Sequence, residues 1–178
     1  MRKLVESTFV SLDGVIGSPE KWSGAYWDDE HDLYARKLLF AADALLLGRE
    51  TYEVFANSWP SRTGDEYSDR INSLPKYVAS TTLQDARWNA TVIKGDVGDE
   101  VAKLKQQPGQ NILKFGTGEL GRTLMRRNLI DEFHIWLFPI VVGSGTRLFE
   151  EGVMPTSMQL VDTTTFRSGI VVLTYAPK

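Results

Sequence analysis

The sequence predicts an α/β fold with a mostly parallel central sheet, flanked by helices on both faces and extended at its end by an antiparallel hairpin. Short apolar runs of strand length alternate with segments of helical periodicity, which is the order typical of parallel sheets. The run at 44–47 is apolar at every position, as expected for a strand buried on both faces. The last two apolar runs, 158–161 and 170–175, flank a turn at 167–169 and predict the hairpin.

The first strand is expected at 3–11, ahead of the turn at Asp13-Gly14. Apolar side chains then recur three and four positions apart over 33–41, behind acids at 28–30 that suit the positive end of a helix. The sequence therefore predicts a helix there. Further strands are expected at 44–47, 76–80, 91–93, 112–115 and 132–138, and further helices from Gly48 onward, at 97–107 and at 119–127.

Composition limits the class of protein. The 178 residues are 42% apolar and include five tryptophans, enough to bury a core, so we expect one domain over 1–178. The 20 Lys and Arg residues nearly balance 23 Asp and Glu, so no global field attracts nucleic acid or a membrane, and neither is expected as a partner. The absence of cysteine excludes thiolate catalysis, and two isolated histidines, His31 and His134, lead us to expect no metal.

The ends and the hydropathy of the chain suggest its location. The N-terminal segment has no apolar run of the signal-peptide type. No apolar stretch reaches the roughly 18 residues that a transmembrane helix needs. We therefore expect a cytoplasmic protein, in which small neutral or anionic ligands need local binding sites.

Two glycine junctions are the best candidates for such sites. Residues 112–121 run from an apolar strand through a glycine turn into a helix, whose first N–H groups lack an internal partner and suit a phosphate. Residues 45–53 repeat this order, with Arg49 in the first helical turn. Together they could hold the pyrophosphate and the 2′-phosphate of one NADPH. Glycine is also common in such turns for conformational reasons alone.

A Rossmann dehydrogenase is disfavoured. The glycine junction at 112–121 comes late in the chain, and the strand after it ends at 139–143 without the acid that would bind a ribose hydroxyl. The nucleotide site is therefore expected in a different α/β fold.

Four segments, in this order, carry a resemblance that spans nearly the whole chain: Ser11-Leu12-Asp13-Gly14-Val15-Ile16, Leu47-Gly48-Arg49-Glu50-Thr51-Tyr52-Glu53, Phe115-Gly116-Thr117-Gly118-Glu119-Leu120, and 130–135 leading to 139–145. Through them the chain resembles the dihydrofolate-reductase-like fold, and within it the reductase domain at the C-terminus of the bifunctional riboflavin-biosynthesis deaminase-reductase. The resemblance implies an NADPH-dependent reductase of a small heterocyclic or ribosylamino substrate, similar to 5-amino-6-(5-phosphoribosylamino)uracil reductase.

The resemblance also implies where NADPH would bind. The adenosine 2′-phosphate would lie near Gly48, Arg49, Thr51 and Tyr52. The adenine ribose would lie near Ser80 and Thr81, and the pyrophosphate near Phe115, Gly116, Thr117, Gly118, Glu119 and Leu120. The nicotinamide would lie by Leu12, Gly14 and Val15.

The chain departs from these relatives in two places. It lacks the His/Cys zinc signature of the deaminase half, so it resembles a freestanding reductase domain. Dihydrofolate reductases carry a helix-borne acid that polarises the pterin, and the acids at 28–32 offer no clean match to the flanking motif. Three alternatives stay open: a pterin reductase of the dihydrofolate reductase type, a nucleotide-binding dimer without turnover, and an enzyme that uses NADH.

Hydride reduction of a C=N or C=O bond needs a proton donor close to the nicotinamide. We expect the donor to be Asp13, in the turn after the first strand, or Asp28, on the facing loop. The alternative roles are a turn in which Asp13 bonds to its own backbone and a helix N-cap at Asp28. Substrate contacts are expected at Trp22, Trp27 and Arg147, and His31 is expected to be exposed to solvent.

The apolar strands at 133–138 and 170–175 suggest self-association. They carry more aromatic and β-branched side chains than one sheet edge usually exposes. We therefore expect a homodimer that forms through this region. A monomer at micromolar concentration would contradict this expectation.

Overall fold

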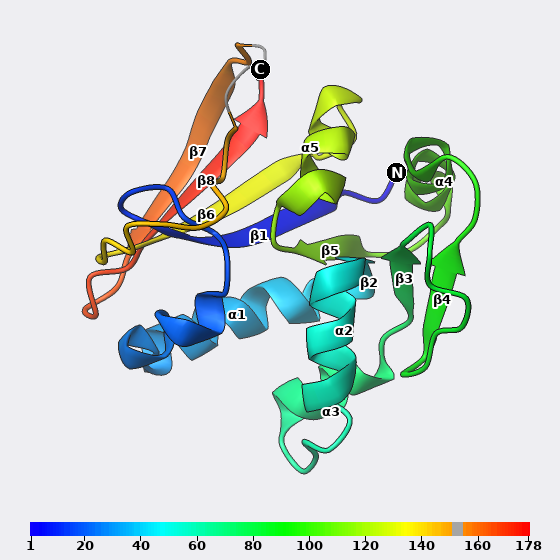
Figure 1. Cartoon of the computed structure of the whole chain (residues 1–178), viewed down its shortest axis with the longest axis horizontal. Helices are drawn as coiled ribbons and strands as arrows, with labels where there is room; N and C mark the ends of the chain where they lie inside the picture. The colour runs from blue at the N-terminus through cyan, green and yellow to red at the C-terminus, as the bar shows by residue number, and fades with distance from the viewer. Residues whose placement is uncertain (151–154) are drawn as a thin grey trace.

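The computed structural model describes residues 1–150 and 155–178 and confirms the predicted α/β class. The strands of this part of the chain are β1 Leu4–Ser11, β2 Ala42–Gly48, β3 Lys76–Ala79, β4 Ala90–Ile93, β5 Asn111–Phe115, β6 Glu132–Phe138, β7 Met158–Thr165 and β8 Val171–Pro177. They form one sheet in the order β4-β3-β2-β5-β1-β6-β8-β7 (Figure 1). All neighbours from β4 to β6 are parallel, and β8 and β7 add the predicted antiparallel hairpin at one edge.

Helices cover both faces of the sheet, as predicted (Figure 1). They are α1 Asp29–Phe40, α2 Arg49–Ser58, α3 Glu66–Ser73, α4 Val97–Gln106 and α5 Gly118–Arg126. The first three pack on one face through a cluster that includes Leu39, Ala56 and Ile71. The last two pack on the other face through a cluster that includes Val101 and Leu124. The result is a three-layer arrangement that leaves the ends of the strands accessible between the layers.

Strand β2 explains why one apolar run has no polar alternation. Leu45 and Leu47 lie in the cluster with α1, α2 and α3, whereas Leu46 lies in the cluster with α4 and α5. All three side chains are fully buried. A strand covered by helices on both faces needs apolar residues at successive positions, so the prediction for this run is confirmed.

The apolar periodicity of the sequence does not reveal α3. Its large apolar side chains are only Tyr67 and Ile71, which is too few for a recognisable helical pattern. The N-cap of the helix is Asp65, whose carboxylate accepts a hydrogen bond of 3.0 Å from the N–H of Ser68. The local sequence therefore supplies the N-cap of this helix, and packing against α1 and the sheet stabilises the rest of it.

The strands on which the dimer prediction rested lie inside the sheet. Trp136 and Phe138 of β6 and Val172 of β8 are buried in a third cluster within one chain, together with Tyr34 of α1. The face of β6 and β8 that carries these side chains is therefore not available to a second subunit. The exposed edge strand is β7, most of whose side chains face solvent. The homodimer stays a prediction, and β7 is a more exposed surface on which it could form.

Candidate functional site

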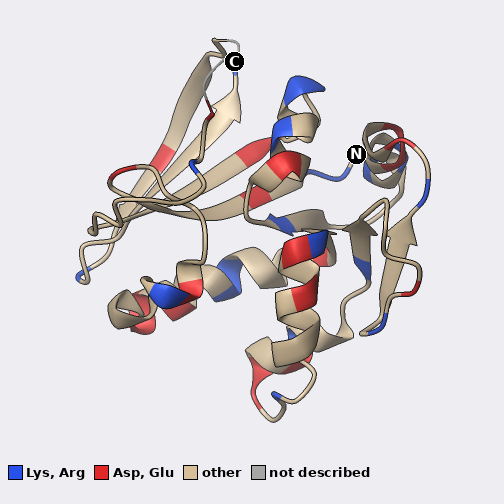
Figure 2. Ribbon diagram, viewed as in Figure 1, with Lys and Arg blue, Asp and Glu red and all other residues tan. Residues whose placement is uncertain are grey.

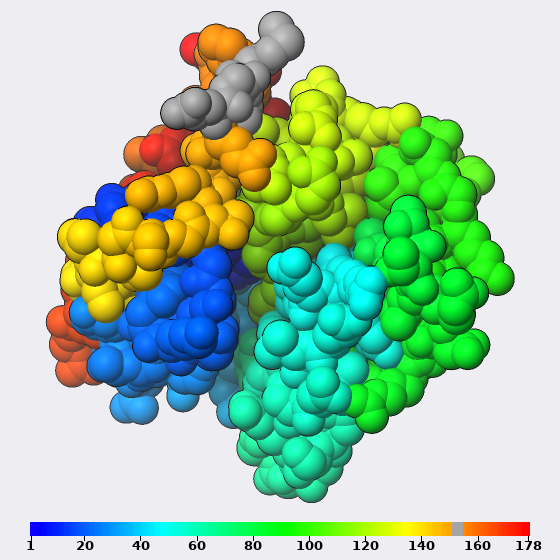
Figure 3. Space-filling view, viewed as in Figure 1, coloured from blue at the N-terminus to red at the C-terminus, as the bar shows by residue number. Residues whose placement is uncertain are grey.

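A groove of about 1780 Å³ crosses the carboxyl ends of the parallel strands. Three strand-to-helix junctions line it: β2 to α2, β4 to α4, and β5 to α5. Figure 3 shows the hollow between the blue N-terminal segment on one side and α2 and α5 on the other. In sheets of this kind ligands bind at these strand ends, so the groove is the candidate site.

The β5–α5 junction has the backbone of a phosphate-binding turn. Gly116 and Gly118 have φ values of 70° and 53°, a conformation that favours glycine. Thr117 is the N-cap of α5, but its hydroxyl donates to Oε1 of Glu6 at 2.7 Å instead of capping the helix. The first N–H groups of α5 therefore lack a side-chain cap, and their residues line the groove. A Cβ at Gly118 would meet no atom within 4 Å, so the turn is open to a ligand.

A buried ion pair supports this junction from below. Nζ of Lys114 lies 3.0 Å from Oε2 of Glu6, and the two side chains are 1% and 3% exposed. The same Nζ donates to the carbonyl oxygens of Gly116 and Thr117, the second at 2.9 Å. Burial lowers the pKa of Lys114, and the charge of Glu6 opposes that shift. The shape of the turn therefore depends on a carboxylate from a different strand, which the glycine motif does not reveal.

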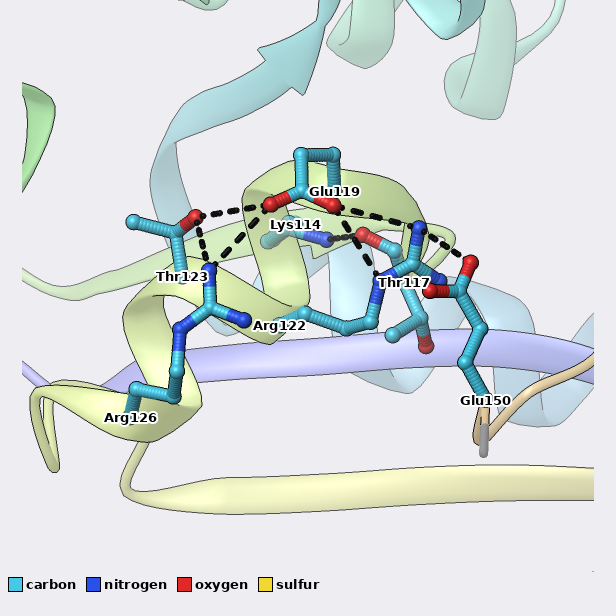
Figure 4. Close-up of polar contacts among 7 residues, drawn as sticks. All are labelled: Lys114, Thr117, Glu119, Arg122, Thr123, Arg126 and Glu150. Atoms are coloured by element: carbon cyan, nitrogen blue, oxygen red, sulfur yellow. Dashed lines mark hydrogen bonds and ion pairs between the residues drawn. The ribbon is translucent and has the colours of Figure 1, made fainter. Parts of the chain in front are cut away.

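Arg122 of α5 also lines the groove. Figure 4 shows its side chain between those of Glu119 and Glu150. Its Nη2 lies 3.0 Å from Oε1 of Glu150 and 3.4 Å from Oε2 of Glu119. Glu119 is paired with Arg126 as well, at 3.2 Å, and hydrogen bonds from Arg126 and Arg122 lower the pKa of its carboxyl. Within the part of the chain that the structure describes, Nη1 of Arg122 has no hydrogen-bond partner. Arg122 is thus a cation of the site that the sequence motifs did not indicate.

The β2–α2 junction brings together the residues expected near a 2′-phosphate. Gly48 is the N-cap of α2 and offers no side-chain cap to the helix. Nε of Arg49 donates to Oε1 of Glu53 at 2.8 Å, and its Nη1 donates to the hydroxyl of Thr82. Arg49 therefore connects α2 to the loop after β3. Thr51, Ser80 and Thr81 line the same groove.

Tyr52 lies outside this groove. Its ring is buried, and its hydroxyl exchanges hydrogen bonds with the backbone of Arg87, accepting from N at 2.8 Å and donating to O at 3.1 Å. Tyr52 lines a separate pocket of about 370 Å³ with residues of the 83–87 segment. The prediction that Tyr52 contacts the cofactor is therefore not supported by its position.

Asp13 does not line the groove. Its carboxylate accepts hydrogen bonds from the hydroxyl of Ser11 at 2.6 Å and from the N–H groups of Val142 and Gly143 at 3.0 and 2.8 Å. These bonds hold the pKa of Asp13 far below its usual range. A carboxyl group that stays ionised cannot supply a proton at neutral pH. Asp13 therefore acts as a tie between the loops that follow β1 and β6, which argues against the catalytic role predicted for it.

The rest of the predicted nicotinamide loop also lies outside the groove. Val15 is buried and forms an isolated antiparallel bridge with Arg147. The guanidinium of Arg147 donates to the carbonyl oxygen of Asp13, so it closes this loop instead of facing a substrate. Leu12 is exposed, and Gly14 supplies a turn with φ of 83°. The groove is reached instead by the following residues, 16–20.

Asp28 takes the alternative role considered for it. It is the N-cap of α1, and its Oδ1 accepts from the N–H of His31 at 2.9 Å, which lowers its pKa. Trp27 lines the groove and stacks on the ring of His31, with centroids 5.0 Å apart and planes at 14°. Trp22 is buried in the cluster with Phe138. Of the two predicted tryptophans, only Trp27 reaches the site.

His31 is buried and not solvated, contrary to the expectation from its place in the first helical turn. Its side chain is 7% exposed and contacts the rings of Phe9 and Trp136. Nδ1 lies 3.3 Å from Oδ1 of Asp32, and Nε2 has no hydrogen-bond partner among the described residues. Burial lowers the pKa of His31, so the imidazole is neutral at pH 7.

A helical spacing could have revealed the inward face of α1. His31, Ala35 and Leu38 stand at positions i, i+4 and i+7, and all three line the groove. With Trp27 they form an apolar and aromatic end of the groove, away from the two glycine junctions. This end suits a flat ring, whereas the junctions suit phosphate groups.

The groove is lined by charges of both signs, and three of its cations, Arg49, Lys114 and Arg122, lie at the two glycine junctions. Figure 2 shows basic and acidic residues interspersed on α1, α2 and α5 in this view. Among the described residues, no group of three or more His, Asp and Glu side chains is placed to hold a metal ion. In the same residues, no helix has the length and apolar character to cross a bilayer.

Comparison with known proteins identifies the relatives of this chain. The profile of the RibD C-terminal domain matches residues 2–172. Two curated proteins of Bacillus subtilis (strain 168) are similar along nearly their whole length. The uncharacterized protein YyaP is 30% identical over 98% of this chain and 94% of its own, and the uncharacterized protein YwjB is 32% identical over 95% of each.

Solved structures share the fold. A Shewanella sp. PV-4 protein assigned provisionally to riboflavin biosynthesis superposes with a TM-score of 0.80 at 24% identity, over 99% of both chains. A pyrimidine reductase-like protein from Corynebacterium diphtheriae gives 0.67 at 13% identity, over 99% of this chain and 92% of that one. The Thermotoga maritima diaminohydroxyphosphoribosylaminopyrimidine deaminase/5-amino-6-(5-phosphoribosylamino)uracil reductase gives 0.66 at 15% identity, over 99% of this chain and 57% of that one.

Proposed function

Because the chain belongs to the RibD C-terminal domain family, we propose that it is an NADPH-dependent reductase of a small heterocyclic or ribosylamino compound. The first compound to test is 5-amino-6-(5-phosphoribosylamino)uracil, since it appears in the name of the T. maritima structural relative. The observation that carries the proposal is one groove that joins two uncapped glycine junctions, each with an arginine beside it.

The residues present fit a dinucleotide with three phosphate groups. The open turn at Gly116 to Gly118 and the uncapped start of α5 suit the diphosphate. Arg49 lies with Thr82 at the β2–α2 end and suits a terminal phosphate, for which a guanidinium is the preferred partner. One continuous groove connects the β2–α2 and β5–α5 junctions. A nucleotide with a 2′-phosphate would use both places at once.

In the proposed reaction the cofactor and the protein have different roles. NADPH supplies the hydride when bound, and the protein orients the acceptor beside it. The aromatic end formed by Trp27, His31 and Leu38 is the part of the groove that would hold a flat acceptor. Because Asp13 and Asp28 are engaged by backbone N–H groups, the proton has to reach the acceptor by another route, such as bulk solvent at the open end of the groove.

Calorimetric titration of the wild type with NADPH and with NADH tests the cofactor. Loss of a charge-assisted phosphate contact costs roughly 1.5–3 kcal/mol, so Arg49→Ala is expected to weaken NADPH binding by about 10-fold to 150-fold. NADH lacks the 2′-phosphate, and its affinity is expected to be the same for both proteins. Arg126→Ala is the matched control because Arg126 carries the same charge but does not line the groove.

The outcomes separate the remaining alternatives. Equal weakening of NADPH and NADH by Arg49→Ala would contradict a 2′-phosphate site. No binding of either nucleotide by the wild type would remove the reductase proposal. Nucleotide binding without oxidation of NADPH by the uracil compound or by dihydrofolate would favour the nucleotide-binding dimer without turnover, a function consistent with the engaged carboxylates of Asp13 and Asp28.

A further inference from the structure

Arg122 is placed differently from Arg126, the other arginine of α5. Its side chain is 10% exposed, whereas that of Arg126, one turn further along, is 63% exposed. Arg122 lines the groove close to the β5–α5 turn, and its charge acts on the buried ammonium of Lys114. A desolvated guanidinium normally has all its N–H groups paired, because each unpaired one loses its hydration without compensation.

The partners of Arg122 do not satisfy this guanidinium. Nη2 is shared between Glu150 at 3.0 Å and Glu119 at 3.4 Å, and Nε reaches Glu119 at 3.4 Å (Figure 4). Nη1 is buried and has no hydrogen-bond partner in the described residues. Glu119 is also engaged by Arg126 and by the hydroxyl of Thr123. Among the residues that the structure describes, Arg122 therefore has one donor group, Nη1, without a partner, and Nη2 becomes available to an anion when Glu150 is displaced.

Glu150 is the partner that could give way. Its side chain is 55% exposed and comes from the connection between β6 and β7, not from a helix or strand. Releasing Glu150 from Arg122 would return its carboxylate to water, and a bound phosphate would replace it beside the buried guanidinium. By contrast, the backbone of Arg122 is fixed within α5, and its side chain is buried.

We propose that Arg122 binds the diphosphate of the dinucleotide through its side chain, and that Glu150 competes with the ligand for the same guanidinium. This inference rests on the proposed function, since it takes the ligand to be a nucleotide with a diphosphate at the β5–α5 turn. A guanidinium presents two parallel N–H donors that match two phosphate oxygens, so the diphosphate can use Nη1 and Nη2 together. Glu150 then lowers nucleotide affinity instead of supporting it.

If Arg122 binds the ligand, substitutions of Arg122 and Glu150 should change ligand affinity in opposite directions. A purely structural ion pair would give changes in the same direction. Arg122→Gln is expected to weaken NADPH and inorganic pyrophosphate roughly 10-fold to 100-fold, as expected for the loss of a charged hydrogen-bonding partner. Glu150→Gln is expected to tighten both ligands about twofold to fivefold, because an exposed competing ion pair is weak. Lys103→Gln is the control, because Lys103 carries the same charge on α4 but is exposed and does not line the groove, and its affinities are expected to stay within about twofold of the wild type. All affinities are measured by calorimetry at one salt concentration.

Each outcome decides the question. Weaker binding by both Arg122→Gln and Glu150→Gln would show that the ion pair only maintains the fold of the site, and it would overturn the inference. Unchanged binding by Arg122→Gln would overturn it as well. If the wild type binds neither NADPH nor NADH, the proposed function fails. The pyrophosphate series then still tests Arg122 separately, and pyrophosphate binding that Arg122→Gln does not weaken overturns its role.

A folding defect is kept apart from a binding defect by a second variant. Arg122→Lys keeps the charge but loses the two-pronged donor, so its affinity for pyrophosphate is expected to lie between those of the wild type and Arg122→Gln. Melting temperatures of all variants are measured alongside. If Arg122→Gln does not fold, the order of Arg122→Lys, wild type and Glu150→Gln in rising affinity supports the inference, and any other order overturns it.

Discussion

The ammonium group of Lys114 lies 3.0 Å from the carboxylate of Glu6, and both side chains are buried under the turn that leads into α5. Lys114 comes from β5 and Glu6 from the neighbouring strand β1, which pair in register at these two positions. The lysine then donates to the carbonyl oxygens of Gly116 and Thr117. The glycine turn is thus held in shape by a contact between strands.

Breaking this pair is expected to destabilise the protein. Glu6→Gln leaves the ammonium of Lys114 buried without a counter-charge, and such a change typically costs about 3–5 kcal/mol. The free energy of unfolding in urea measures the loss. The double variant Glu6→Gln with Lys114→Met is expected to lose less than the sum of the two single changes, because no unpaired charge remains. Additive losses would show that the two groups do not stabilise each other.

Replacing Asp13 by Asn is expected to lower stability at neutral pH. The pKa of Asp13 is depressed by the hydroxyl of Ser11 and by the N–H groups of Val142 and Gly143. Its contribution is therefore present above the unfolded-state pKa of about 3.9 and is lost as the pH falls through the lower pKa of the folded state. The difference in melting temperature between wild type and variant should shrink in acid. A difference that does not change with pH would contradict this role.

Replacing His31 by Phe is expected to raise stability by about 1 kcal/mol, because the change removes an unpaired buried nitrogen among aromatic rings. The pKa of His31 is lowered by burial, although Asp32 and Asp28 oppose the shift. The unfolded chain therefore binds a proton more readily, and wild-type stability falls as the pH drops below about 6.5. The advantage of the variant over the wild type should grow in that range.

His134 provides the control for this prediction. Its Nδ1 lies 2.8 Å from the hydroxyl of Tyr34 and its Nε2 lies 2.6 Å from Oε1 of Glu132. His134→Phe removes both hydrogen bonds and leaves their partners unpaired, so it is expected to lower the free energy of unfolding by about 1–3 kcal/mol. Equal effects of the two histidine substitutions would mean that the Nε2 of His31 is satisfied in solution, for example by a buried water molecule.

A homodimer, if it forms, is expected to use β7. Leu160 and Val161 on this edge strand are 50% and 58% exposed, and an unpaired strand edge favours association with a second copy. Val161→Lys places a charge on that edge and is expected to shift sedimentation from dimer to monomer at micromolar concentration. A wild-type monomer, or a dimer that tolerates the lysine, would contradict the use of β7.

The order of the helices and strands was predictable because each element has a pattern that lies within its own segment of the sequence. The fully apolar run of β2, the helical spacing of α1 and the turn at 167–169 each depend on neighbouring residues only. The same locality explains the miss at α3, where a short polar segment is made helical by its packing against α1. Local patterns do not reveal how much of β6 is buried, because its position between β1 and β8 depends on the path of the whole chain.

The sequence by itself determined the α/β class, the two glycine junctions and the family, since these depend on periodicity, turn residues and ordered motifs. The tertiary structure alone decided what the individual side chains do. It placed Asp13 against the loop after β6, buried His31 among rings and brought Arg122 to Glu150. Burial and hydrogen-bond partners arise from contacts between segments far apart in the sequence, and local patterns carry no information about such contacts.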